Sequence, residues 1–290
     1  MSTDVKQARW PRQIPYIIAS EACERFSFYG MRNILTPFLM TALLLAVPEH
    51  LRAGEAKDVF HSFVIGVYFF PLLGGWLADR YLGKYNTILW LSIVYVIGHL
   101  FLALFETSKE GFYTGLFLIA LGSGGIKPLV SAFMGDQFDQ SNKKLAQKAF
   151  DIFYFTINFG SFFASLLMPL TLKYFGAAVA FGIPGILMAL ATLFFWLGRK
   201  RYVHVAPEPK NPHSFLKVVK TALLSKEQGK ANGGFYLALV GFALALFSLS
   251  QTPTLGFVAA FCLALVLVMG FGGAGAAIQL ERARGVHPDI

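Results

Sequence analysis

The first long apolar stretch of the chain contains four ionisable residues, Glu21, Glu24, Arg25 and Arg32. At about 100° per residue in a helix, positions 21, 24, 25, 28 and 32 fall within an arc of roughly 100° and form one polar stripe. Such a stripe must face protein or water, because ionisable groups are costly in hydrocarbon. Glu21 and Arg25 have the i, i+4 spacing of an ion pair, and buried carboxyl groups near a cation can bind and release protons. The alternative is a buried ion-pair network that only fixes helix packing, although hydrocarbon would fill a passive core at lower cost.

A second ionisable group, Lys127, lies in another apolar stretch and is followed by a proline. A lone ammonium at this depth needs a carboxylate partner, and we expect Glu21 or Glu24 to supply it; the alternative is a lysine that snorkels to the membrane surface. Tyr68 and Asn158 are polar groups in apolar runs, which taken alone are typical of packing residues. We interpret His99 as structural.

The composition shows which elements must position these groups. The chain has 290 residues, of which 56% are hydrophobic and only 14% are charged, whereas a soluble domain has about 25% charged residues. This excludes a cytosolic enzyme, and the two cysteines lie in apolar runs, which excludes a disulfide framework or a Cys-based metal site. A membrane-spanning helix needs about 20 apolar residues. Eight stretches qualify, so we predict an all-α polytopic membrane protein with spans near residues 14–47, 60–78, 86–105, 112–134, 149–172, 177–197, 234–251 and 254–280.

The distribution of basic residues predicts the orientation. With the N-terminus inside the cell, sixteen Lys and Arg residues up to residue 233 fall on the inner side and four on the outer side, as the positive-inside rule requires. The net charge of +9 is therefore a topology signal that faces anionic lipid, and we expect no nucleic-acid partner. The predicted organisation is an inner tail, six spans, a basic inner linker, a two-span hairpin and a second inner tail, over residues 1–13, 14–198, 199–233, 234–280 and 281–290.

Four motifs resemble one transporter family. The loop with Gly75, Asp79, Arg80 and Lys84 resembles the loop between helices two and three of major facilitator transporters, where glycine allows close packing and the charges can clamp helix ends. The stretch from Glu21 to Gly30 is similar to the E-x-x-E-R-F-x-Y-Y signature of proton-dependent oligopeptide transporters (the POT/PTR family). The stretches Gly124–Pro128 with Phe133–Asp139, and Phe150–Phe162, are similar to this family's helix-four and helix-five regions.

The resemblance implies a function for each group. Family members are proton-coupled symporters of di- and tripeptides, built from two six-helix bundles, and many bacterial members insert two helices between the bundles. It implies that Glu21, Glu24, Arg25 and Lys127 couple transport to protons, and that Gly75, Asp79, Arg80 and Lys84 form a gating motif. It also implies that peptide is bound by Tyr29, Arg32, Tyr68, Lys127 and Asn158. Position 28 is Phe where the family often has Tyr.

The sequence thus predicts the six-helix N-terminal bundle and inserted hairpin of a peptide–proton symporter in a bacterial-type inner membrane. The proton gradient drives it, without a cofactor or metal. The C-terminal bundle is absent from the sequence, so the missing half or a second chain is an expected partner. Two alternatives stay open: a relative that carries another small solute such as nitrate, and a truncated protein that does not transport. The sequence has no nucleophile elbow or metal cluster, so we do not expect an enzyme.

Overall fold

The chain is all-α in a computed structural model that describes residues 10–207, residue 220 and residues 232–286. It divides into two compact units, residues 1–209 and residues 210–290. No strand occurs in these described ranges. The first unit contains every residue of the predicted site.

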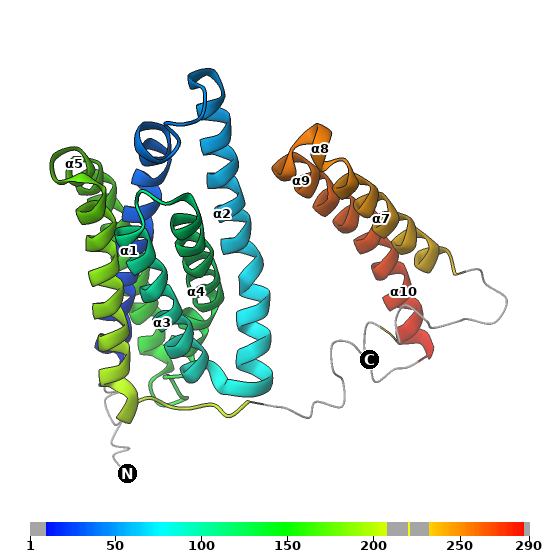
Figure 1. The fold of residues 1–290 in the computed structure, drawn as a ribbon. Helices are drawn as coiled ribbons and strands as arrows, with labels where there is room; N and C mark the ends of the chain where they lie inside the picture. The colour runs from blue at the N-terminus through cyan, green and yellow to red at the C-terminus, as the bar shows by residue number, and fades with distance from the viewer. Residues whose placement is uncertain (1–9, 208–219, 221–231, 287–290) are drawn as a thin grey trace, which may run out of the picture. The chain divides into compact units, whose positions relative to one another are not determined.

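The first unit is a bundle of long helices that run up and down side by side (Figure 1). Short π-helical turns, η1 and η2, extend α1 and α2, and a 3-10 turn, η3, follows α5. The elements are α1 (Ile14–Phe38), η1 (Leu39–Leu43), α2 (Glu49–Leu77), η2 (Ala78–Leu82), α3 (Gly83–Leu104), α4 (Lys109–Gly135), α5 (Lys143–Leu197) and η3 (Gly198–Lys200).

Two glycines with positive φ break long helical stretches into separate spans. Gly83 has φ 74° where η2 meets α3, and Gly176 has φ 82° inside α5. Residues with a Cβ atom rarely adopt this backbone conformation, whereas glycine adopts it at no steric cost. The break at Gly176 separates the predicted spans 149–172 and 177–197, so the element labelled α5 contains two helical segments, 143–175 and 177–197.

Large aromatic side chains fill the centre of the bundle. The rings of Phe38, Phe112 and Phe181, from α1, α4 and the second segment of α5, have centroids 5.0 to 5.3 Å apart. Elsewhere glycines let helices approach closely: a Cβ built on Gly98 of α3 would lie 2.9 Å from the carbonyl oxygen of Gly115 in α4. Close backbone approach at small residues is the usual way in which membrane helices pack.

The second unit is a helical hairpin. Its elements are α7 (Gly233–Ser250), α8 (Thr252–Leu255), α9 (Phe257–Leu267), η4 (Val268–Gly272) and α10 (Gly273–Val286). α7 packs against α9, η4 and α10, with Gly241 beside Phe271 and Gly234 beside Gly275. Most large side chains of this unit are exposed, as expected for helices that contact lipid.

The described helices contain five stretches that are long and apolar enough to cross a membrane: 49–104, 109–135, 143–200, 233–250 and 257–283. The first and third each contain two of the predicted spans. α1 is not among them because Glu21, Glu24 and Arg25 lie near its centre. The predicted first span, 14–47, is too long: the regular helix ends at Phe38, one residue after Pro37, and its π-helical extension ends at Leu43.

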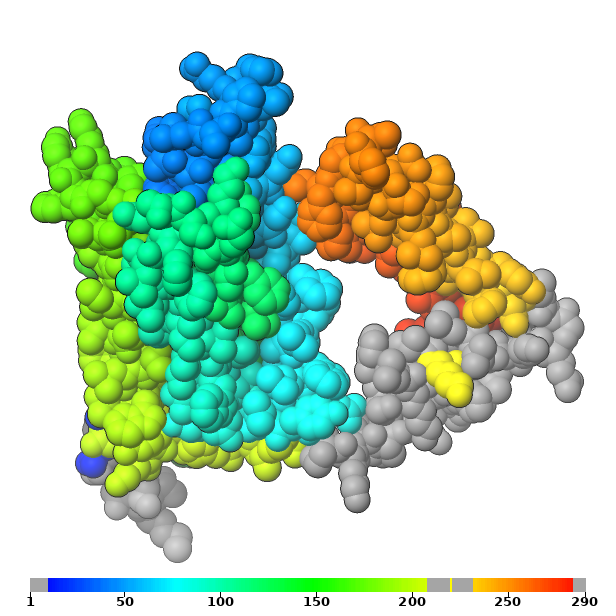
Figure 2. Space-filling model, in the orientation of Figure 1, coloured from blue at the N-terminus to red at the C-terminus, as the bar shows by residue number. Residues whose placement is uncertain are grey.

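Only part of the predicted linker and tails lies within the residues that the structure describes. Residues 199–207, predicted to begin a linker, pack against the first unit and run along its lower edge, in yellow-green in Figures 1 and 2. Residues 208–219, 221–231, 1–9 and 287–290 of the predicted linker and tails lie outside the described residues.

Candidate functional site

The acidic and basic residues of α1 form a buried ionic cluster. Glu21, Glu24 and Arg25 are only 6%, 3% and 5% exposed. Arg25 Nε lies 3.0 Å from Glu21 Oε1, and Arg25 also forms an ion pair with Glu24. The i, i+4 pair and the inward orientation agree with the prediction. Two carboxylates and one guanidinium carry a net charge of −1 when all are ionised, so one added proton makes the cluster neutral. The arrangement is therefore able to bind a proton at a buried position, where net charge is costly.

α5 fixes the position of this cluster from one side. Gly160 of α5 faces the turn of α1 that carries Arg25, and a Cβ built on it would lie 3.3 Å from both Ala22 O and Phe26 N. This is tighter than ordinary van der Waals contact, so the two backbones meet almost directly. The absence of a side chain at position 160 thus allows α5 to cross α1 at the level of the ion pairs.

Lys127 has a different environment from the predicted one. Among the described residues its ammonium makes no ion pair with Glu21 or Glu24; it lies 4.9 Å from the ring centroid of Tyr68 and 5.9 Å from that of Phe28. Aromatic faces attract cations electrostatically. Lys127 is within electrostatic range of both glutamates, but Arg25 already pairs with both acids. Lys127 therefore lies at the edge of the cluster, where the two aromatic rings contact its ammonium.

Phe28 connects the two cationic positions. Its ring is 5.8 Å from the Arg25 guanidinium and 5.9 Å from the Lys127 ammonium, and it meets the Tyr29 ring edge-on at 5.5 Å. The phenylalanine that replaces the family's usual tyrosine therefore keeps the aromatic face but provides no hydroxyl group. Sequence spacing placed position 28 on the polar stripe, and the structure gives its ring the role of a spacer between two cations.

The other predicted peptide-binding residues lie on the accessible side of the helices. Tyr68 is 67% exposed, Asn158 is exposed, and Tyr29 and Arg32 are half-buried. The Arg32 guanidinium lies 5.6 Å from the Phe60 ring, and Asn158 Nδ2 donates a hydrogen bond to Tyr154 O within its own helix at 2.8 Å. The structure thus brings Lys127, Tyr68, Phe28 and Tyr29 together, whereas Asn158 forms no hydrogen bond with any of them among the described residues.

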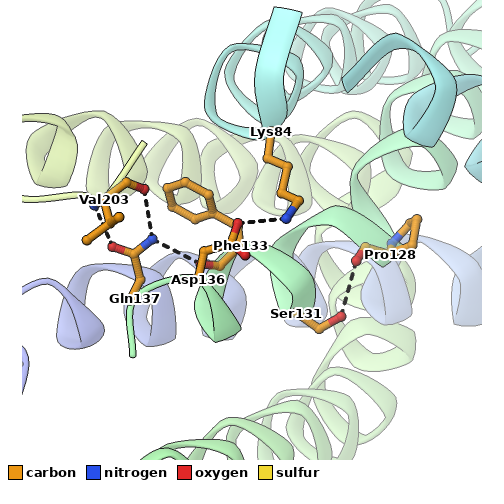
Figure 3. Close-up of polar contacts among 7 residues, drawn as sticks. All are labelled: Lys84, Pro128, Ser131, Phe133, Asp136, Gln137 and Val203. Carbon is orange, nitrogen blue, oxygen red and sulfur yellow. Dashed lines mark hydrogen bonds and ion pairs between the residues drawn. The ribbon is translucent and has the colours of Figure 1, made fainter. Parts of the chain in front are cut away.

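At the lower end of the bundle, the predicted clamp has a different composition. Lys84 Nζ lies 2.7 Å from Oδ2 of Asp136, the residue that directly follows α4 (Figure 3), and neither Asp79 nor Arg80 forms an ion pair in the described part of the chain. Within the described first unit, the close helix contact is made by Gly74 and not by Gly75. A Cβ on Gly75 would meet nothing within 4 Å, whereas Gly74 lies directly against the backbone of Gly125 in α4. A one-residue shift rotates a helix by about 100°, so only one of two adjacent glycines can face the neighbouring helix.

A buried glutamine that the sequence did not reveal fastens the chain after α5 to this end. We call residues 198–207 the strap. Gln137 Nε2 donates to Val203 O at 3.2 Å and to Phe133 O at 3.0 Å, and Val203 N donates to Gln137 Oε1 at 2.8 Å (Figure 3). The side-chain amide thus pairs with the backbone of Val203 as a neighbouring strand would. Its only sequence signal was its position in the Phe133–Asp139 motif.

Aromatic packing holds the rest of the strap. Tyr202 is buried, with ring centroids 5.0 Å from Phe133 and 5.2 Å from Phe195, and burial raises the pKa of its hydroxyl. Arg201 donates a hydrogen bond to the Tyr16 hydroxyl at 2.7 Å. The strap therefore ties together the lower ends of α1, α4 and the second segment of α5.

Comparison with known proteins identifies the family. A sequence model described as the POT family matches residues 85–244. The chain belongs to the POT family. It is 38% identical over 236 residues to solute carrier family 15 member 2 of Rattus norvegicus, which covers 77% of this chain and 32% of that protein. The peptide transporter family 2 protein of Caenorhabditis elegans is 39% identical over 231 residues.

Solved POT family structures have the same helical fold. The crystal structure of the POT family transporter PepTSo is 77% identical, with a TM-score of 0.90 over 97% of this chain and 56% of that chain. An auto-inhibited POT family peptide transporter is 61% identical, with a TM-score of 0.88. This POT family chain thus has a multi-pass membrane transporter fold. It spans about half the length of these solved relatives and about a third of the curated ones.

Proposed function

We propose that this chain is the N-terminal half of a proton-coupled symporter of di- and tripeptides that works by alternating access. The observation that carries the proposal is the division of the cations of the first unit. Arg25 pairs with two buried carboxylates, whereas Lys127 and Arg32 lie near aromatic rings and form no ion pair among the described residues. Two cations without acidic partners on an accessible side suit the carboxylate of a peptide.

The buried cluster provides the link to protons. A proton that binds to Glu21 or Glu24 neutralises one of the two acids that hold Arg25. The electrostatic attraction on Arg25 and on the nearby Lys127 then weakens, and Lys127 becomes freer to bind the peptide carboxylate. A ligand that binds one state better than the other shifts the equilibrium between them, so proton and peptide together favour one conformation. This coupling needs only the proton gradient, and we propose no cofactor and no enzymatic step.

The second wall of the peptide site lies outside this half. The proposed binding residues of α1, α2 and α4 lie on an accessible side of the first unit, and the solved relatives are almost twice as long as this chain. We propose that a C-terminal bundle, on the same chain or on a second one, closes the site and supplies the acidic group for the peptide ammonium. We refer to the assembly of both halves as the two-bundle transporter.

The distribution of charge supports an orientation. We propose that the protein lies in a bacterial-type cytoplasmic membrane with its N-terminus in the cytoplasm. The lower end of the bundle, with Lys84, Arg199, Lys200 and Arg201, then faces the cytoplasm, where basic residues near the membrane meet anionic lipid.

The test is peptide uptake into liposomes that contain the purified two-bundle transporter. An inward proton gradient should drive accumulation of radiolabelled dialanine, a protonophore should abolish it, and unlabelled dialanine should compete while nitrate should not. Accumulation that does not depend on the gradient would overturn the coupling, and competition by nitrate alone would overturn the substrate class. The 290-residue chain by itself is the control. It should insert into the liposome membrane, and these liposomes should not accumulate dialanine.

A further inference from the structure

Behind the ionic cluster, three helices of the first unit meet at a hydrogen-bonded bridge. Ser27 of α1, one turn after Glu24, donates its hydroxyl proton to the carbonyl oxygen of Pro184 in α5 at 2.7 Å. The same Ser27 Oγ lies 2.9 Å from Nε2 of His99 in α3. Ser27 and His99 are both completely buried. The bridge therefore joins α1, α3 and the second segment of α5 at a site that neither water nor lipid reaches.

The number of protons determines which atom donates in each contact. A serine hydroxyl has one proton, and Ser27 gives it to Pro184 O. In the second contact Ser27 must therefore accept, and His99 must donate from Nε2. His99 Nδ1 has no hydrogen-bond partner among the described residues, which suits the lone pair of the neutral ring better than a buried N–H group. His99 thus acts as a fixed hydrogen-bond donor to Ser27. It does not act as a group that binds the transported proton.

The surroundings connect the bridge to the ionic cluster. The Tyr95 ring stacks on His99 with centroids 5.0 Å apart, and its hydroxyl lies near Ser27 and Ser123 and within electrostatic range of Glu24 and Arg25. Tyr95 from α3 thus lies beside the bridge, with Glu24 and Arg25 from α1 within electrostatic range of its hydroxyl. Glu21 from α1 and Lys127 from α4 interact electrostatically with the ionic cluster. From α5 the bridge receives the Pro184 carbonyl group and the backbone of Gly185.

The helices on either side of His99 approach closely at two glycines. A Cβ built on Gly185 would lie 3.1 Å from His99 Cβ, and a Cβ on Gly98 would lie 2.8 Å from Ile119 N of α4. α3 is therefore held between α4 and α5 at this level. With Gly160 against its opposite side, α1 is fixed in both position and rotation where it carries Glu24 and Arg25.

We propose that His99, through Ser27, is a positioning residue for proton coupling: it holds the turn of α1 that carries Glu24 and Arg25 in the rotation at which Arg25 pairs with both glutamates. This inference rests on the proposed function. His99 contacts neither peptide nor the acids, so its contribution is the orientation of α1. Loss of the Nε2–H donor lets α1 rotate and changes how readily the cluster binds a proton, while the peptide-binding residues stay in place.

The test compares two substitutions in the two-bundle transporter. His99→Gln keeps an N–H donor near the position of Nε2, whereas His99→Phe keeps a ring against Tyr95 but has no donor. Gradient-driven accumulation of dialanine is measured between pH 5 and 8, together with exchange of labelled for unlabelled dialanine without a gradient. His99→Phe should lower accumulation about tenfold, the size expected for an unsatisfied buried hydrogen-bonding group, and should displace the pH profile. Its exchange should stay within about twofold of wild type, and His99→Gln should restore both accumulation and profile.

Each other outcome has a definite meaning. A wild-type pH profile in His99→Phe would overturn the inference, and so would an equal loss of accumulation and exchange with an unchanged profile, because that is the behaviour of a purely structural residue. If His99→Phe fails to fold, Ser27→Ala takes its place, since it removes the acceptor of the same hydrogen bond and should displace the profile in the same way. If wild type itself accumulates no dialanine with the gradient, the proposed function fails before the bridge is tested.

Discussion

Charged side chains are paired in the interior of the first unit, whereas the cations on its accessible side have no acidic partner among the described residues. Inside, Arg25 and two glutamates form a cluster that is complete within one helix, and a buried hydrogen-bonded bridge lies behind it. On the accessible side, Lys127 and Arg32 contact aromatic rings, and no described carboxylate pairs with them. A half-transporter thus contains a finished proton site but only part of a peptide site.

This difference separates what one bundle can do from what needs two. Ion pairs within α1 need no second domain, because the i, i+4 spacing brings the partners together. Cations that bind a peptide carboxylate must not be paired with acids of the same bundle. Their anionic partner is then the peptide, and the rest of the peptide site comes from a second bundle. We therefore expect changes inside to affect coupling and changes on the accessible side to affect binding.

The largest effect is expected for Glu24→Gln in the two-bundle transporter. The amide keeps the size of the side chain but cannot bind a proton at neutral pH, so gradient-driven accumulation should fall to the level seen without a gradient. Exchange across the membrane should persist, because the peptide site is intact. Both are measured in the same liposome preparation, and the control is Asp58→Asn, which changes an exposed acid of α2 that forms no ion pair among the described residues. Undiminished accumulation in Glu24→Gln would refute the role of the interior cluster.

Lys127→Ala should come next. It removes a cation from the proposed carboxylate site, and loss of one partner of a desolvated charge pair costs about 2–5 kcal/mol. Uptake and exchange should therefore both fall by about thirtyfold or more, in contrast to Glu24→Gln. Wild-type kinetics in this variant would mean that Lys127 only packs on Tyr68 and Phe28. The measurement is initial uptake rate over a range of dialanine concentrations.

Arg32→Ala should have a smaller effect, confined to affinity. The guanidinium lies near the Phe60 ring and forms no ion pair among the described residues, so we expect it to act as a ground-state contact for the peptide. Removing such a contact raises KM and leaves kcat unchanged; we expect about a tenfold rise, which corresponds to about 1.4 kcal/mol. Arg32→Lys, which keeps the charge, should recover part of the affinity. A lower kcat at constant KM would place Arg32 in the conformational step instead.

The smallest effect on the protein itself is expected for Asn158→Ala. The residue is exposed, and among the described residues its side-chain amide bonds only to Tyr154 O in the same helix, so stability should change by less than about 0.5 kcal/mol. KM for dialanine should rise about threefold if the amide meets the peptide backbone. Thermal unfolding in detergent and uptake kinetics measure the two quantities, and a large loss of stability would show that Asn158 is a packing residue.

The helical order and the inward orientation of the α1 stripe could be predicted because both depend on local periodicity. Glu21 and Arg25 pair at the distance that their spacing suggests, and the glycine break at position 176 falls between two predicted spans. Contacts between helices were harder. The sequence suggested an acid for Lys127, but Arg25 already pairs with both acids, and the cation–π contact with Tyr68 depends on how α2 crosses α4.

The lower end of the bundle shows the same limit. The motif with Asp79, Arg80 and Lys84 indicates a charged loop, but not that Lys84 reaches Asp136, more than fifty positions later in the chain. Gly74 and Gly75 are equivalent in the sequence, and only helix rotation decides which one packs. Likewise, nothing in the pattern around Gln137 indicated that its amide would bind the backbone of Val203.

The attachment of Val203 to Gln137 also gives the molecule a fixed reference point. Val205 is about half exposed, and it follows directly after the backbone that Gln137 holds. A fluorophore at Val205→Cys, with Cys23 and Cys262 replaced, will therefore move with the end of α4 and not with the chain that follows. Distances measured from this origin would record how the rest of the transporter moves around one rigid bundle during a transport cycle.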